Sequence, residues 1–114
     1  MISESRQPKW DLFEAAFLLE AVLKVEAGQE KKRDAIKRVS SALRAIAINK
    51  GLAVNKTYRN ENGIAFQFQS MEFSMFGRMS ATHKTGSKLF DEAVALYRTD
   101  VNEYKNILTT AHSL

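Results

Sequence analysis

Three glycines divide this chain into segments of helical length. Gly28, Gly51 and Gly77 each stand directly after a run in which apolar residues recur every three or four positions. Glycine adopts at little cost the left-handed backbone conformation in which many helices end. The one proline, Pro8, precedes all three runs. We therefore predict helices that end at these glycines.

The residues that open these runs are typical of helix N-termini. Asp11-x-x-Glu14 has the spacing of a capping box, and Asp100-x-x-Glu103 repeats it. The side-chain oxygens at such positions accept hydrogen bonds from free N–H groups of the first turn. We expect five helices: from Trp10 to just before Gly28, from Lys31 to Lys50, from Gly63 to Phe76, from a cap at Thr85 or Ser87, and from a cap at Asp100.

The third of these segments also fits a β-hairpin. Asn62-Gly63 is a strong hairpin signal, because both residues tolerate the positive φ angles of a tight turn. A strand would use Ile64, Phe66 and Phe68, whereas a helix would use Ile64, Phe68, Met71 and Met75. The run between Gly63 and Gly77 is long for a strand, and Gly77 has a role only if a helix ends there. We predict a helix with Asn60 or Asn62 as its N-cap.

The predicted fold class is all-α, a compact bundle of about five helices. Residues 10–114 are expected to form a single helical domain, and residues 1–9 a flexible tail. With 45% hydrophobic residues in 114, the chain has enough apolar surface for a core. The first helix carries charges scattered around its axis, which is typical of a central helix or of one that offers apolar surface to a partner.

Several kinds of site are excluded or poorly supported by composition. The chain has no cysteine, so thiolate metal ligands and a cysteine nucleophile are impossible. His83 and His112 lie 29 residues apart, and no phosphate-binding Walker loop is present. We expect no metal, no cofactor and no enzymatic activity. The longest apolar run is too short to cross a membrane, which favours a cytoplasmic protein.

One pair of residues has the spacing of a catalytic motif. Arg78 and His83 match the R-x-x-x-x-H pattern, which resembles the motif of HEPN ribonucleases. In that family, arginine and histidine act on a scissile phosphate within a helical bundle. Here the residue after the arginine is Met79 rather than a polar one, and the pair falls in a predicted exposed loop. An HEPN-like ribonuclease is therefore a remote alternative.

The basic residues are concentrated in one segment. From Lys31 to Arg59 there are nine Lys/Arg residues and one acidic residue, and the remainder of the chain has 8 basic and 12 acidic residues. On a helix, Arg33, Lys37 and Arg44 share one flank and span about 16 Å. Such a flank can contact several phosphates of a nucleic acid. The alternative is a solvated helix face without a ligand.

Arg59 extends this segment to the start of the third helix. At a helix N-terminus, Arg59 and free N–H groups could hold a phosphate, with Tyr58 stacked on a base. In the alternative interpretation, Tyr58 is part of the core, Asn60 caps the helix, and Arg59 pairs with Glu61 or Glu72. We favour this alternative for Tyr58 and Asn60. Arg33, Lys37, Arg44 and Arg59 are the predicted nucleic-acid-binding residues.

A longer series of residues resembles a known helical module. The series is Tyr58-Arg59-Asn60-x-x-Gly63-Ile64-x-x-Gln67, then Met71-Glu72, Ser87-x-x-Phe90, Tyr97 and Tyr104. It is similar to an uncharacterised module of bacterial defence and mobile-element proteins, found near the N-termini of HNH-endonuclease-like and other multidomain proteins. The resemblance covers about residues 10–112. It implies an accessory role beside a catalytic domain, in target binding or assembly, and no catalytic residues.

Two functions are consistent with these features. The first is a non-enzymatic domain that associates with nucleic acid through the basic face of the second helix. The second is a protein-interaction or dimerisation module that buries apolar surface of the first or third helix against a partner protein or a second copy. Binding to nucleic acid should weaken steeply with salt, whereas dimerisation should depend on protein concentration.

Overall fold

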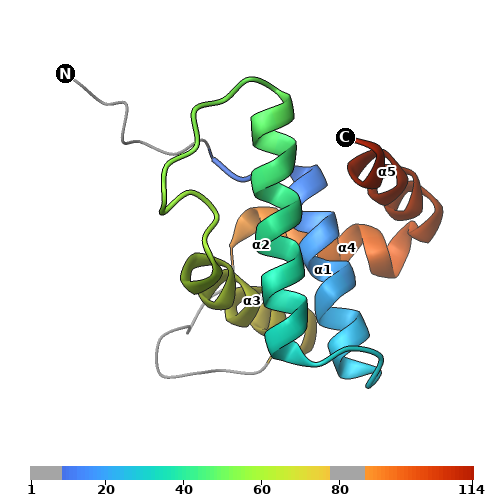
Figure 1. Cartoon of the computed structure of the whole chain (residues 1–114). Coiled ribbons are helices and arrows are strands. Elements are labelled where there is room, and N and C mark those ends of the chain that lie inside the picture. Colours follow the sequence, from blue (N-terminus) through green and yellow to red (C-terminus); the bar gives the residue numbers. More distant parts are fainter. Residues whose placement is uncertain (1–8, 78–86) are drawn as a thin grey trace.

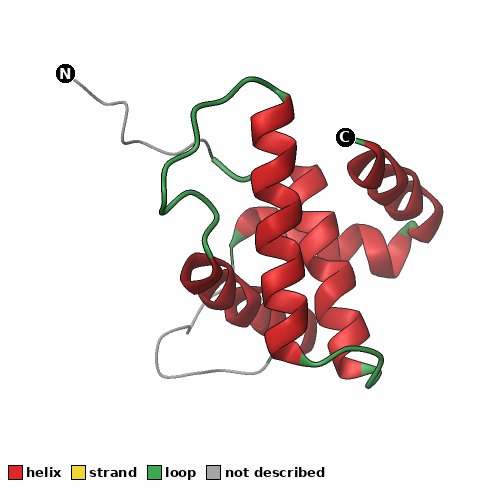
Figure 2. Ribbon diagram, viewed as in Figure 1, coloured by secondary structure: helices red, strands yellow, loops and turns green. Residues whose placement is uncertain are grey.

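The computed structural model describes residues 9–77 and 87–114, which form five α-helices without a strand (Figures 1 and 2). The predicted tail lies outside the described residues except for Lys9. The helices are α1 (Leu12–Glu26), α2 (Lys32–Asn49), α3 (Glu61–Phe76), α4 (Lys88–Thr99) and α5 (Val101–Ser113). The all-α fold class and the compact five-helix arrangement are confirmed.

Helix α1 is the centre of the molecule. It packs against each of the other four helices, and Figure 1 shows it surrounded by them. Residues 15–19 and Ala21 and Val22 are buried. A helix buried on several sides cannot have a single polar face, which explains why its charges are scattered in the sequence.

The predicted caps are present at the N-termini of four helices. The Asp11 carboxylate accepts a hydrogen bond from the Glu14 N–H at 2.8 Å, and the Glu14 carboxylate accepts one from the Asp11 N–H at 3.1 Å. Asn60 caps α3 by accepting from the Gly63 N–H at 2.8 Å. Ser87 and Asp100 cap α4 and α5. Helix α2 begins without a side-chain cap at Lys31.

The ambiguous stretch before Gly77 is helical, as predicted. Gly28, Gly51 and Gly77 have φ angles of 75°, 83° and 71°, the left-handed values expected for residues at helix ends. In α3 the buried residues include the predicted stripe Ile64, Phe68, Met71 and Met75. The helix prediction is therefore confirmed, and Asn62-Gly63 lies in the first turn of α3.

Helix α5 is attached to α1 at both ends of its length. The Tyr104 hydroxyl donates a hydrogen bond to the Ala16 carbonyl at 3.1 Å, and burial raises the pKa of Tyr104. Near the C-terminus, His112 Nε2 lies 2.8 Å from Glu20 Oε1. The helical spacing of Tyr104, Ile107, Leu108, Ala111 and Leu114 predicts that all five face inward. Leu114 instead follows the last helical turn and is 43% exposed, so the prediction is wrong for this residue.

Candidate functional site

Internal ion pairs neutralise part of the basic segment. Carboxylates lie within 3.3 Å of three of its nine cations: Glu72 contacts Lys32 at 3.3 Å, Glu30 contacts Arg38 at 2.8 Å, and Glu14 contacts Arg59 at 3.0 Å. The bidentate hydrogen bonds from Arg38 lower the pKa of Glu30, so this pair is charged at neutral pH. These three cations contribute little net charge to the surface.

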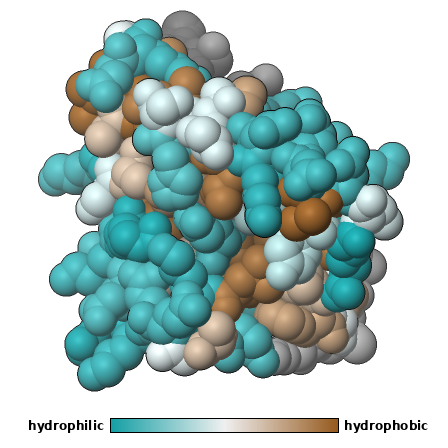
Figure 3. Space-filling model, turned by 90° about the vertical axis from the view of Figure 1, so that its right-hand side faces the viewer, coloured by the Kyte–Doolittle hydropathy of each residue, from teal (hydrophilic) through white to brown (hydrophobic). Residues whose placement is uncertain are grey.

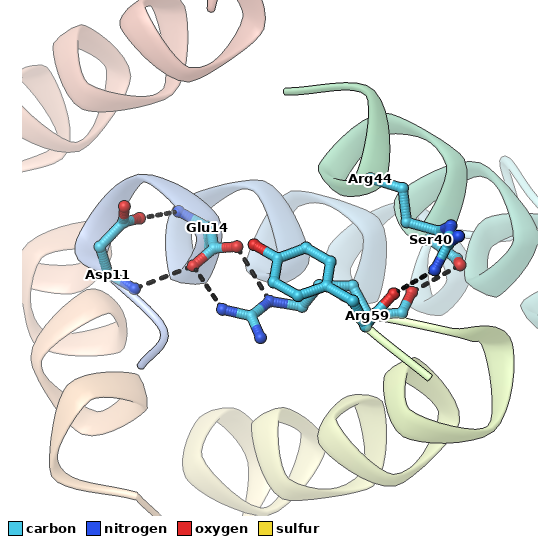
Figure 4. Close-up of polar contacts among 6 residues, drawn as sticks. Asp11, Glu14, Ser40, Arg44 and Arg59 are labelled. Carbon is cyan, nitrogen blue, oxygen red and sulfur yellow. Dashed lines mark hydrogen bonds and ion pairs between the residues drawn. The ribbon is translucent and has the colours of Figure 1, made fainter. Parts of the chain in front are cut away.

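Arg59 is not part of an exposed surface. Its side chain is 4% exposed, and Nε and Nη2 donate hydrogen bonds of 3.0 and 3.1 Å to the two carboxylate oxygens of Glu14 (Figure 4). A guanidinium in this position cannot reach a phosphate backbone outside the molecule. We therefore withdraw Arg59 from the predicted nucleic-acid-binding residues. Glu14 of α1, which was not among the expected partners Glu61 and Glu72, binds its guanidinium.

Aromatic rings and the backbone hold Arg59 in place. The guanidinium lies 4.9 Å from the Trp10 ring centroid and 4.6 Å from that of Tyr58. The backbone carbonyl of Arg59 accepts a hydrogen bond from Ser40 Oγ of α2 at 2.6 Å. Arg59 also has a φ of 46°, the one positive value among non-glycine residues in the described ranges. Trp10, Glu14, Tyr58 and Arg59, which we call the Arg59 cluster, thus join the α2–α3 loop to α1.

Arg44 supports the same loop from the other side. Its Nη1 donates hydrogen bonds to the carbonyls of Asn55, at 3.0 Å, and Tyr58. The Asn55 side chain in turn accepts from the N–H groups of Thr57 and Tyr58. Carbonyl groups are neutral, so these bonds position the guanidinium without cancelling its charge. Arg44 remains a positive group, with a structural role that its sequence position did not indicate.

Arg33 and Lys37 lie exposed on the outer flank of α2. The Arg33 side chain is 79% exposed, and its 3.7 Å contact with the exposed Asp34 is of the weak, solvated kind. Lys37 and Lys56 are exposed and have no acidic partner within residues 9–77 and 87–114. Lys56 follows Asn55, which Arg44 contacts. Arg33, Lys37, Arg44 and Lys56 form what we call the basic strip.

A shallow depression adjoins the strip where α2 meets α3. Its volume is about 410 Å³, and it is lined by Lys32, Arg33, Ile36, Glu61, Asn62 and Ala65. Glu61 lowers the positive potential at this end. The strip is therefore most positive from Lys37 onwards, toward Arg44 and Lys56.

A second hollow surface, which we call the anchor groove, lies between α1, α2, α5 and the α2–α3 loop. Its two adjoining parts share five residues: Asp11, Glu14, Leu43, Ile46 and Lys50. One part also reaches Lys9, Tyr58 and Leu52, and the other reaches Phe13 and Leu114. Figure 3 views the molecule from the side of α5 and shows apolar surface exposed between hydrophilic areas.

The remaining predictions concern other chemistry. Arg78 and His83 lie outside the described residues, so the HEPN-like motif stays a prediction. Within residues 9–77 and 87–114, no group of three or more His, Asp or Glu residues could hold a metal ion. Among the same residues, no helix is long and apolar enough to span a membrane.

No protein-family model matches the chain, and comparison with curated proteins and with solved structures finds no match.

Proposed function

We propose that this protein is a non-enzymatic domain that binds nucleic acid through the basic strip. The supporting observation is the charge that remains after internal pairing. Carboxylates neutralise Lys32, Arg38 and Arg59, whereas Lys37, Arg44 and Lys56 have no carboxylate partner among the described residues and keep their charges. A row of cations on a rigid helix can follow a phosphate backbone without reading its sequence. The accessory role implied by the family resemblance is consistent with this mode of binding.

The salt dependence of binding tests this proposal. A fluorescently labelled duplex and a single strand of the same length are titrated with the protein at several salt concentrations, and binding is followed by anisotropy. Four phosphate contacts predict that the logarithm of the duplex affinity falls against the logarithm of salt with a slope of about −3 to −4. Replacing Arg33→Glu and Lys37→Glu should weaken binding and reduce the slope by about 2.

A matched control separates the strip from overall charge. Lys88→Glu with Lys105→Glu changes the net charge equally, at exposed positions of α4 and α5. This control should bind the duplex nearly as well as the unmodified protein. Equal weakening in both double variants, or no binding of either probe at low salt, would contradict the proposal.

A further inference from the structure

The anchor groove has a size that suits a single side chain. Its larger part, beside Tyr58 and Leu52, has a volume of about 130 Å³. Pockets for whole small-molecule ligands start at about 300 Å³, whereas an apolar cavity of about 150 Å³ holds benzene. Leu43, Ile46 and Ala47 of α2 form an apolar wall of this hollow, and charged residues make up half of its lining. The hollow therefore fits one aromatic or leucine-sized group better than a cofactor.

Exposed apolar side chains extend the groove beyond this hollow. Phe13 of α1 is 37% exposed, Leu52 is 44% exposed, and Leu114 is 43% exposed. Phe13 and Leu114 line the narrower part of the groove, and Leu52 lines the larger part. Apolar side chains that lie together around a hollow are typical of a binding surface for another protein. The occupant must therefore be longer than the one group that fills the hollow.

The charged residues around the groove indicate the sign of the charge that an occupant should carry. Asp11 and Glu14 line it, but Asp11 accepts the α1 capping bond and Glu14 is bound by Arg59. Lys9 and Lys50 line the same hollow, are exposed, and have no acidic partner in the described parts of the chain. Arg59 thus compensates Glu14, whereas the capping bond leaves Asp11 its charge, so two unpaired lysines face one uncompensated carboxylate. An occupant with carboxylates beside its apolar group complements this arrangement.

We propose that the anchor groove binds an acidic amphipathic segment of a partner protein, with one aromatic or leucine side chain inserted beside Tyr58 and carboxylates near Lys9 and Lys50. The groove and the basic strip have no residue in common, although Arg44 of the strip bonds to the carbonyl of Tyr58, which lines the groove. Variants of Lys9 and Lys50 and variants of Arg33 and Lys37 therefore test the two proposals separately.

Selection from a displayed library of random 12-residue peptides tests this inference. The library is selected on the intact protein and depleted on the Lys9→Glu/Lys50→Glu variant. We expect enriched peptides that carry one aromatic or leucine residue flanked by Asp or Glu. A synthetic peptide of the enriched sequence should shift the amide NMR signals of Leu43, Ile46 and Leu114. Replacing its apolar anchor by alanine should weaken binding at least tenfold.

Matched variants decide between this occupant and others. Lys9→Glu/Lys50→Glu should weaken peptide binding at least tenfold, whereas Lys88→Glu/Lys105→Glu and Arg33→Glu/Lys37→Glu should leave it within twofold. Enrichment of basic peptides, no enrichment, or shifts confined to residues outside the groove would overturn the proposal. Concentration-dependent dimerisation in sedimentation, with shifts at the same groove residues, would also overturn it by identifying a second copy as the occupant.

Discussion

At the scale of single residues, Arg59 combines a buried charge with an unfavourable backbone conformation. A non-glycine residue at positive φ is costly and persists only where its surroundings hold it. Here Glu14 binds the guanidinium, and Ser40 binds the carbonyl. The bridge joins residues 45 positions apart in the sequence, so it connects the α2–α3 loop directly to the start of α1. The loop is thereby held against the central helix.

Breaking the Glu14–Arg59 pair should strongly destabilise the protein. Glu14→Ala leaves the buried guanidinium without its counter-charge and also removes half of the α1 capping box. We expect the free energy of unfolding to fall by about 3–5 kcal/mol in urea titrations followed by circular dichroism. The control is Glu20→Ala, which removes a more exposed contact with His112 and should cost about 1 kcal/mol or less.

The double variant Glu14→Leu/Arg59→Met completes the measurement. It removes both charges while keeping apolar volume. Its loss in free energy of unfolding should therefore be smaller than the sum of the losses measured for Glu14→Leu and Arg59→Met separately. Equal costs for Glu14→Ala and Glu20→Ala, or strict additivity in the double variant, would show that the pair is not energetically coupled.

At the scale of elements, the glycine at the end of α3 is needed for its conformation. An added Cβ at Gly77 would have no neighbouring atom within 4 Å, so space does not explain the glycine. The φ angle of 71° explains why glycine is favoured at this position, because a residue with a Cβ is strained in the left-handed region. Gly28 and Gly51 also have positive φ angles, but each lies one residue further on, after the right-handed C-cap residues Ala27 of α1 and Lys50 of α2.

Gly77→Ala should lower the free energy of unfolding by about 1 kcal/mol. Gly77→Asn should cost less, because asparagine tolerates the left-handed region better than other residues with a Cβ. Chemical denaturation of the two variants under one set of conditions checks the order. If the alanine variant is as stable as the unmodified protein, backbone strain is not the reason for this glycine.

Local and distant interactions differ in how well the sequence predicts them. The caps at Asp11, Asn60 and Asp100 act within three residues, so short sequence patterns reveal them. The Arg59 partner was predicted as Glu61 or Glu72, the acids of the adjoining helix, whereas Glu14 comes from α1. Arg59 and Glu14 are 45 positions apart, and no short sequence pattern predicts a contact between residues so far apart. The groove was missed for the same reason, since four separate segments line it.

The candidate nucleic-acid surface was predicted only in part, and for a related reason. Helical spacing correctly places Arg33 and Lys37 on an exposed flank of α2. Helical spacing cannot predict that Arg44 bonds to carbonyls of the α2–α3 loop. The loop has no regular secondary structure, so its path does not follow from the sequence pattern. Lys56 belongs to the strip because the α2–α3 loop brings the neighbouring Asn55 to Arg44, which helical spacing does not predict.

At the scale of the whole molecule, α1 determines how the domain opens. Every other helix packs against it, and Tyr104 of α5 bonds to its backbone. Exposing α1 amides to solvent therefore requires the separation of several helices at once, which is close to global unfolding. A helix at the periphery can open while the remainder of the core stays packed.

Amide hydrogen exchange should show this difference. We expect residues 15–22 of α1 to exchange with free energies close to that of global unfolding, and the last turn of α5 to exchange by a lower-energy opening. NMR exchange rates at low denaturant give both values. Faster exchange in the middle of α1 than in α5 would contradict the central role of α1.

The central position of α1 also affects how the protein is made. A ribosome produces α1 before the other four helices, and Tyr104 follows Ala16, to which it bonds, by 88 residues. At about 5–20 residues per second, roughly 4–18 s separate the synthesis of the two residues. During that interval the nascent chain carries an apolar helix before the segment that covers part of it has been synthesised. The stage of translation most exposed to misfolding thus follows directly from the placement of one helix.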